Sequence, residues 1–179
     1  TFIGWDPSVA ATMPDDDVTY TANWQEKGDI VYKVRHELQN IEDDNFTLDI
    51  EETLNGATGA EVTPLRKTYE GFTAPAAQTA NILADGSLVI TYQYTRNKYT
   101  LTWDVNGGNA LNEPYSKDEL KYGASITAPA DPTWTGHTFH GWDKTVPATM
   151  PAGDLTLIAQ WTTDTYNNIS FKSADETMG

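Results

Sequence analysis

The chain has 179 residues, 39% of them hydrophobic, which is enough to fill small cores rather than one large core. Its formal net charge is −15, from 26 acidic and 11 basic residues, and this charge repels phosphate backbones and anionic membranes. We therefore expect neither a nucleic-acid partner nor membrane insertion. The chain has no cysteine, which excludes a disulfide framework, a thiolate zinc site and a thiol nucleophile.

The composition favours β-structure. Six Trp, nine Tyr and five Phe stand among Thr and β-branched residues, the types that suit half-buried strands. Gly and Pro recur at the spacing expected of short strands joined by turns, and no long helical period is present. The sequence therefore predicts a mainly β fold built of small modules.

The chain repeats part of itself. Residues 1–24 (TFIGWDPSVAATMPDDDVTYTANW) align without gaps with residues 138–161 (TFHGWDKTVPATMPAGDLTLIAQW). The matches include Thr1/Thr138, Phe2/Phe139, Gly4/Gly141, Trp5/Trp142, Asp6/Asp143, Met13/Met150, Pro14/Pro151 and Trp24/Trp161. So long a period predicts a composite unit of two modules, at 25–96 and 97–162. Residues 1–24 are then the C-terminal part of a truncated module, and the tail at 163–179 is the start of a following one. We therefore expect the chain to be a piece of a longer protein.

Alternation of apolar side chains with a period of two places the predicted strands. In chain order, their apolar faces are Val18, Tyr20, Ala22 and Trp24; Tyr32, Val34 and Leu38; Phe46, Leu48 and Ile50; Leu88, Ile90, Tyr92 and Tyr94; Tyr99, Leu101, Trp103 and Val105; and Leu155, Leu157, Ala159 and Trp161. The polar segment 40–45 predicts a turn between the second and third strands. Only residues 116–120 indicate a helical turn, with Ser116 as N-cap and Glu119 completing a capping box.

The two modules share a weaker pattern. Residues 59–63 (GAEVT) and 68–73 (TYEGFT) parallel residues 123–127 (GASIT) and 133–138 (TWTGHT). Like residues at like points predict that the two modules are variants of one fold.

Residues 97–161 carry a specific set of motifs: NKYTLTWDVNGG, KYGASITAPADPTWTGHTFHGWD and TMPAGDLTLIAQW. They resemble the internalin-type B repeat, or Listeria-Bacteroides repeat, with its strand ending in D-x-N-G-G, its P-x-x-x-G-Y-T-F-x-G-W core and its terminal A-x-W. Trp103 stands where Phe is usual and His137 where Tyr is usual. Residues 1–24 resemble the last third of the same repeat.

The module at 25–96 contains IVYKVRHELQN, FTLDIEETLNGATGAEVT, KTYEGFTAP and ADGSLVITYQYTRNKYT, and it is similar to the MucBP-like repeats of large surface proteins. The two resemblances imply an α+β fold of the β-grasp, ubiquitin-like type for each module, in an elongated array. They also imply a secreted or cell-wall-associated protein of Gram-positive type that acts in adhesion or as a spacer. Neither family implies catalytic residues, so we expect no enzyme activity, no cofactor and no metal-binding residue.

The recurring tryptophans indicate packing more than binding. Trp5, Trp24, Trp142 and Trp161 occupy matched positions, and a repeat unit re-uses its core residues in every copy. Trp134 is different because it lies in the turn-rich segment 131–136. It is the best candidate for an exposed ring that stacks on a glycan.

Histidines, glycines and paired carboxylates favour structural roles. His140 matches Ile3 in the repeat, and His36 and His137 stand alone in aromatic-rich strands. Gly107-Gly108 follows a strand but opens no helix, so it predicts a turn rather than a phosphate cradle. Glu51-Glu52 point to opposite faces of a strand and cannot act on one bond.

Two further kinds of site stay open. The acidic runs 15–17 and 42–44 are typical of a solvated surface, with a calcium site as the alternative. A self-formed Lys-Asn isopeptide bond would need both side chains buried beside a carboxylate, which a sequence does not show.

Two classes of function follow. The first is a stalk or spacer of a surface adhesin whose partners are neighbouring repeats of the same chain and a host surface glycoprotein. The second is a module that binds glycans or mucin through exposed aromatic rings. Because isolated hairpins are marginal in water, we also expect Phe2, Trp5, Tyr20 and Trp24 to dock on the 25–96 module or on the tail of another copy.

Overall fold

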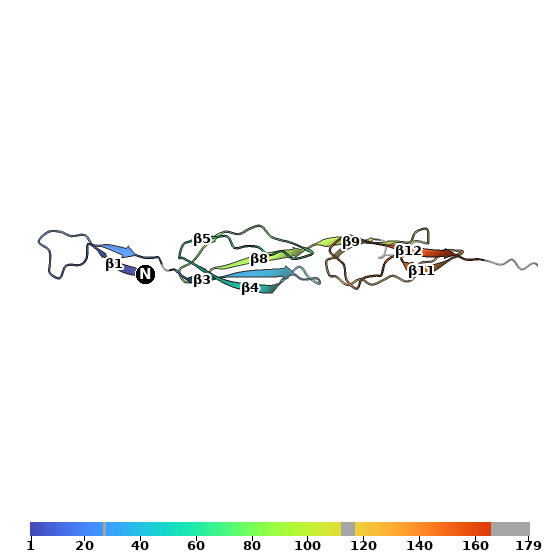
Figure 1. Ribbon diagram of the computed structural model, residues 1–179, viewed down its shortest axis with the longest axis horizontal. Helices are drawn as coiled ribbons and strands as arrows, with labels where there is room; N and C mark the ends of the chain where they lie inside the picture. Colours follow the sequence, from blue (N-terminus) through green and yellow to red (C-terminus); the bar gives the residue numbers. More distant parts are fainter. Residues whose placement is uncertain (27, 112–116, 166–179) are drawn as a thin grey trace, which may run out of the picture. The chain divides into compact units, whose positions relative to one another are not determined.

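The computed structural model describes residues 1–26, 28–111 and 117–165. The chain divides into two compact units, Thr1–Asn97 and Lys98–Gly179. In the described ranges every regular element is a β-strand (Figure 1). The predicted mainly β class is therefore confirmed.

The first unit contains a mixed four-stranded sheet. Its strands are β3 (Ile30–Gln39), β4 (Phe46–Gly56), β6 (Phe72–Thr73) and β8 (Val89–Arg96), in the order β4-β3-β8-β6. β3 pairs antiparallel with β4 and parallel with β8, and β6 pairs antiparallel with β8. Between β4 and β8 the chain also forms a small antiparallel ladder of β5 (Glu61–Val62) and β7 (Ala80–Asn81).

The second unit repeats this arrangement. Its strands are β9 (Lys98–Asp104), β10 (Lys117–Lys121), β11 (His137–Trp142) and β12 (Leu155–Thr163), in the order β10-β9-β12-β11. β9 pairs antiparallel with β10 and parallel with β12, and β11 pairs antiparallel with β12. The two units thus share one strand order, as their common motifs predict.

Two expectations of helix were wrong for the described residues. The α part of the expected α+β type is missing from them, because the described residues between the first and last strand of each sheet form strands, extended chain and turns. The helical turn expected over 116–120 is also replaced, since Lys117–Lys121 pairs along β9 as strand β10. Ladder hydrogen bonds outweigh a local capping-box signal here. Ser116 lies outside the described residues.

Equivalent glycines hold the same turn in both units. Gly71 and Gly136 have φ values of 75° each, in the left-handed region that favours glycine. The carbonyl of each glycine accepts a backbone hydrogen bond at 2.9 Å. The donor is the residue directly after the last strand of the unit, Asn97 after β8 and Asp164 after β12. A side-chain bond of 2.6 Å accompanies each, from Thr73 to Asn97 and from Thr138 to Asp164.

Each unit has a core of its own on one face of its sheet. In the first unit the buried residues are Ile30, Tyr32, Val34, Ile82, Ile90, Tyr92 and Tyr94. In the second they are Leu101, Trp103, Met150 and Leu157, with Trp142 and Leu155 packed against them. The predicted apolar faces of β8, β9 and β12 are the faces that pack. The separate cores explain why the chain divides into two units.

Residues 1–24 form a separate hairpin of β1 (Phe2–Asp6) and β2 (Thr21–Trp24). The core role expected for its tryptophans is wrong in this structure, because Trp5 is 47% and Trp24 71% exposed. Docking of Phe2 and these rings on the 25–96 module or on the tail of another copy stays a prediction. The strand that covers the matching residues in the second unit, β9, has no counterpart on this hairpin within the described part of the chain. The strand expected in the tail lies outside the described residues.

Candidate functional site

Trp134 lies in a cluster of rings at one end of the second unit. His137 stacks on it, with ring centroids 3.7 Å apart and planes at 11°, and Trp161 meets it edge to face at 5.6 Å. A Cβ atom placed on Gly107 would lie 2.9 Å from Trp134 Cη2, so the backbone of Gly107 also touches the ring. Trp134 is therefore half-buried, and His137 covers one face of its indole.

The D-x-N-G-G motif at residues 104–108 forms a turn, and the two tryptophans of this cluster pack against it. Asp104 Oδ1 accepts the backbone N–H of Asn106 at 2.9 Å, and Gly108 donates to the Val105 carbonyl at 3.0 Å. The Val105 carbonyl also accepts the indole N–H of Trp161 at 2.9 Å. Asn106 has φ 47°, in the left-handed region, and its side-chain amide donates to the Ala159 carbonyl at 3.0 Å. The motif is thus a turn, as predicted, and its hydrogen bonds also connect the end of β9 to β12.

Gly108 is required by packing rather than by a ligand. A Cβ on this residue would lie 2.5 Å from Trp161 Cζ2 and 3.2 Å from the Thr133 carbonyl oxygen. Real side chains essentially never approach so closely, so the position accepts only glycine without movement of Trp161 or the backbone. Each glycine of the motif therefore packs against one tryptophan: Trp134 lies against Gly107, and Trp161 lies against Gly108.

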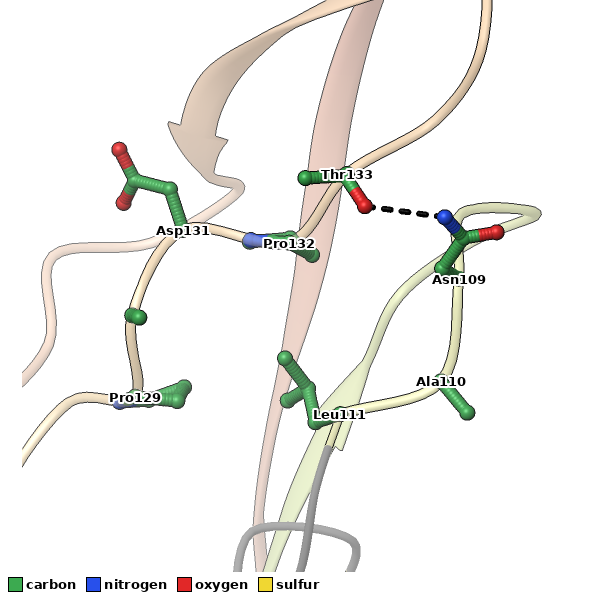
Figure 2. A pocket seen from close by; sticks show the side chains of 8 residues that line it. Asn109, Ala110, Leu111, Pro129, Asp131, Pro132 and Thr133 are labelled. Atoms are coloured by element: carbon green, nitrogen blue, oxygen red, sulfur yellow. Dashed lines mark hydrogen bonds between the residues drawn. The ribbon is translucent and has the colours of Figure 1, made fainter.

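A hollow of about 250 Å³ lies beside this cluster, between residues 109–111 and 129–133 (Figure 2). Asn109 and Thr133 close one end through a side-chain bond of 2.9 Å and a backbone bond of 2.7 Å. Leu111 and Pro132 line the interior, and Asp131 points its carboxylate away from Leu111 (Figure 2). The hollow is large enough for a sugar ring but presents few polar groups to hold one.

The first unit contains a polar network that sequence reasoning did not find. His36 is fully buried, with Nδ1 2.9 Å from the Tyr94 hydroxyl and Nε2 3.1 Å from Glu52 Oε2. Glu52 Oε1 accepts a bond of 2.7 Å from Lys67 Nζ, and the backbone N–H of Lys67 donates to the Tyr94 hydroxyl at 2.7 Å. Because the Glu52 carboxylate only accepts, Nε2–H of His36 donates to it, which leaves Nδ1 to the Tyr94 hydroxyl. Every buried polar side-chain atom of the described network thus has a hydrogen-bond partner.

Electrostatics agree with this assignment. Hydrogen bonds from Lys67 and His36 hold the pKa of Glu52 below its usual range, which keeps it an acceptor. Burial raises the pKa of Tyr94, which keeps its hydroxyl protonated as the donor to His36. Burial and a bond of 2.7 Å to Asp49 raise the pKa of Tyr69. The network is a structural cluster whose members hydrogen-bond to one another.

The paired carboxylates Glu51 and Glu52 and the histidine His140 do not form a common site. Glu51 forms ion pairs with Lys33 and Arg35 at 2.6 and 2.8 Å on the outer face of the sheet, whereas Glu52 bonds to His36 on the core side. The predicted separation of this carboxylate pair is therefore confirmed. His140 is exposed on β11.

Trp142 and Trp161 lie partly buried in the second unit, as packing residues should. Phe139 joins them, with ring centroids 5.5 Å from Trp142 and 5.4 Å from Trp161. Trp103 is 5% exposed and lies 4.9 Å from Trp142.

The acidic runs 15–17 and 42–44 were the candidates for a calcium site. Across residues 1–26, 28–111 and 117–165, no group of three or more His, Asp or Glu side chains is placed to hold a metal ion. In the same ranges no helix is long and apolar enough to cross a membrane.

The strand order and motif geometry define a small β repeat module, and the comparisons with known proteins agree. The family model of the Listeria-Bacteroides repeat domain matches residues 99–160. The second unit thus carries an internalin-type B repeat, as its motifs indicate. Domains of this kind are typical of surface proteins rather than of enzymes.

The relatives are much longer than this chain. A protein named as a Gly-rich membrane protein of Evansella cellulosilytica is 33% identical over 95 residues, or 49% of this chain and 10% of the relative. A second membrane protein of that organism is 30% identical over 98 residues, or 50% of this chain and 14% of the relative. Internalin H of Listeria monocytogenes is 35% identical over 79 residues, or 39% of this chain and 13% of the relative. The chain is therefore a repeat segment of the surface-protein kind.

Proposed function

We propose that the chain is a stalk or spacer segment of an extracellular bacterial adhesin, held at the cell wall or secreted, and that it is not catalytic. The observation that carries this proposal is the use of the motif residues. The D-x-N-G-G turn, the Trp134–His137 stack and the Thr–Asn/Asp bonds at the unit ends all complete a module, and none is left to meet a substrate. Such a unit serves as a spacer because its stability comes from its own contacts.

The resemblance of residues 25–96 to MucBP-like repeats supports the same proposal. The first unit has the strand order of the second, so alternation of two related modules along an array is compatible with both sequences. In such an array the partners of each module are its neighbours, and a host glycoprotein or glycan is the partner of the adhesin as a whole.

The test displays the segment on a bacterial surface. One and two copies of residues 25–162 are placed between a wall anchor and a peptide epitope, and the height of the epitope above the wall is measured. A spacer predicts a constant gain in height for each added copy. No gain with the second copy contradicts the proposal.

A second candidate function is glycan or mucin binding through Trp134 and the hollow beside it. The observation that favours it is the size of the hollow and its position next to a half-buried indole. Binding to a glycan array or to mucin, lost in Trp134→Ala but kept in Trp103→Phe, would support this function. No retention of the wild-type chain on either surface would remove it.

A further inference from the structure

A further hollow lies in the first unit, on the segment that precedes the TYEGFT motif. It has a volume of about 310 Å³ and is lined by residues 63–68 together with Ala74 and Ala77. In the second unit, the segment before the matching TWTGHT motif lines the hollow beside Trp134. The matching segments of the two units therefore each border a hollow.

The two hollows differ in charge. Arg66 and Lys67 line the hollow of the first unit. Counting back from the threonine that opens the shared motif, Asp131 stands in the second unit at the place of Arg66. The first hollow thus carries two cations in a chain whose formal net charge is −15. Because the field of such a chain repels anions in general, an anion in this hollow would be held by local contacts.

Tyrosines of the sheet fix the backbone on both sides of Arg66. The Tyr92 hydroxyl donates to the Pro64 carbonyl at 2.8 Å, and the Tyr94 hydroxyl accepts the backbone N–H of Lys67 at 2.7 Å. The second unit has alanine and tryptophan at the matching places of β12, so these bonds are particular to the first unit. The segment that carries Arg66 is therefore positioned before a ligand arrives.

The Arg66 side chain is held in place without being neutralised. Its Nη1 donates to the Pro75 carbonyl at 2.7 Å, which leaves further N–H donors on the guanidinium. Lys67, by contrast, pairs with Glu52 at 2.7 Å. No carboxylate within the described residues pairs with Arg66. A guanidinium that is already positioned and still has donors favours bidentate binding of a carboxylate.

The other walls of the hollow suit a single sugar ring. Thr63 and Thr68 bring hydroxyl groups, and Leu65, which is 88% exposed, brings an apolar side chain. A sugar ring has hydroxyl groups around its edge and C–H groups on its faces, so it matches both kinds of wall. The hollow holds about one ring, and one guanidinium without an ion pair matches one carboxylate.

We propose that this hollow binds an acidic sugar of the uronic-acid kind, a single ring that carries one carboxylate. The carboxylate lies on the Arg66 guanidinium, the ring hydroxyls bond to Thr63 and Thr68, and Leu65 packs against the C–H face. The network of His36 and Glu52 supports the site, because it holds Lys67 next to Arg66. The site depends neither on the spacer role nor on Trp134.

The test titrates the isotope-labelled full chain with glucuronate and, separately, with glucose, at constant ionic strength. The two sugars differ only in the carboxylate, which glucose replaces with a CH₂OH group. Glucuronate should shift the backbone resonances of residues 63–68 and 74–77 saturably, and glucose should leave them unchanged. Residues 129–133 should not respond to glucuronate, because Asp131 repels its carboxylate, so the second unit is an internal control.

Substitutions of the arginine sharpen the test. Arg66→Gln should weaken glucuronate binding about tenfold or more, because it removes a hydrogen-bonded charge pair. Arg66→Lys keeps the charge but loses the bidentate geometry, so its affinity should lie between those of the wild type and Arg66→Gln. Arg35→Gln is the matched control, since Arg35 pairs with Glu51 on the outer face of the sheet, and it should bind like the wild type. Amide-exchange protection in β3 and β8 shows that each variant is folded.

Several results would overturn the proposal. These are no saturable shift with glucuronate, equal shifts with glucose, or equal loss of affinity in Arg66→Gln and Arg35→Gln. Acetate provides the last check. Binding of acetate as tightly as glucuronate would show that the hollow takes any small anion and does not recognise a sugar.

Discussion

The residues of the most specific sequence motif in this protein, D-x-N-G-G, have a packing role. Gly107 and Gly108 are the clearest case, because each backbone carries the ring of a tryptophan. The sequence indicated a turn there, but the tryptophans that need it are far along the chain, so their contacts were beyond a local reading. The His36 network was missed for the same reason, since its partners Glu52 and Tyr94, and Lys67 that bonds to both of them, come from three separate segments.

Substitution of Gly108 tests this packing. Gly108→Ala should lower the free energy of unfolding of the second unit by about 1–3 kcal/mol, because the new methyl group overlaps Trp161. Gly153→Ala is the matched control, since a Cβ there meets nothing within 4 Å. Denaturant titration followed by tryptophan fluorescence measures both. Equal stability of the two variants would show that Trp161 moves freely.

The Glu52 network predicts a dependence of stability on pH. The pKa of Glu52 is lowered from the model-compound value of 4.5, so its contribution is present above that pH and is lost as the pH falls through its folded value. Glu52→Gln should therefore flatten the melting-temperature profile below about pH 4.5, where the wild type loses this contribution. Glu70→Gln, at an exposed position, should keep the wild-type profile. A Glu52→Gln profile that overlays the wild type would contradict this role.

At the scale of elements, alternation and turns predicted much of the structure. The hairpin of β3 and β4 and the core faces of β8, β9 and β12 follow from a period of two. The parallel pairing of first and last strands was not predicted from the local pattern, because partners such as Val34 and Ile90 are far apart in sequence. The segment read as a helical turn became β10 because pairing with β9 satisfies its backbone.

Matched core residues test whether each sheet is stable through its own contacts. Ile90 and Leu157 are 3% and 0% exposed at matching places on β8 and β12. Each change to alanine should cost about 2–5 kcal/mol. Leu157→Ala should shift unfolding of the second unit and leave amide-exchange protection in β3 and β8 unchanged, and Ile90→Ala should do the reverse. Loss of protection in both units from either change would contradict independent folding.

At the scale of the whole molecule, the account rests on two self-contained modules of one strand order. The internal repeat predicted the tandem organisation, and the shared turns at Gly71 and Gly136 give it a physical basis. The exposed face of the β1–β2 hairpin was not predicted, because we expected its aromatic residues to be covered by the 25–96 module or by the tail of another copy. A repeat sequence reports which residues form a core, but not whether every strand of that core is present.

Small-angle X-ray scattering of the full chain in solution tests the spacer role most directly. Two modules with separate cores and a high negative charge have little reason to collapse on each other, so the radius of gyration should clearly exceed the roughly 16 Å expected for a compact domain of this length. The excess should persist at high salt, because salt screens the charge repulsion but leaves the two cores separate. A radius of gyration near the compact value would contradict the stalk.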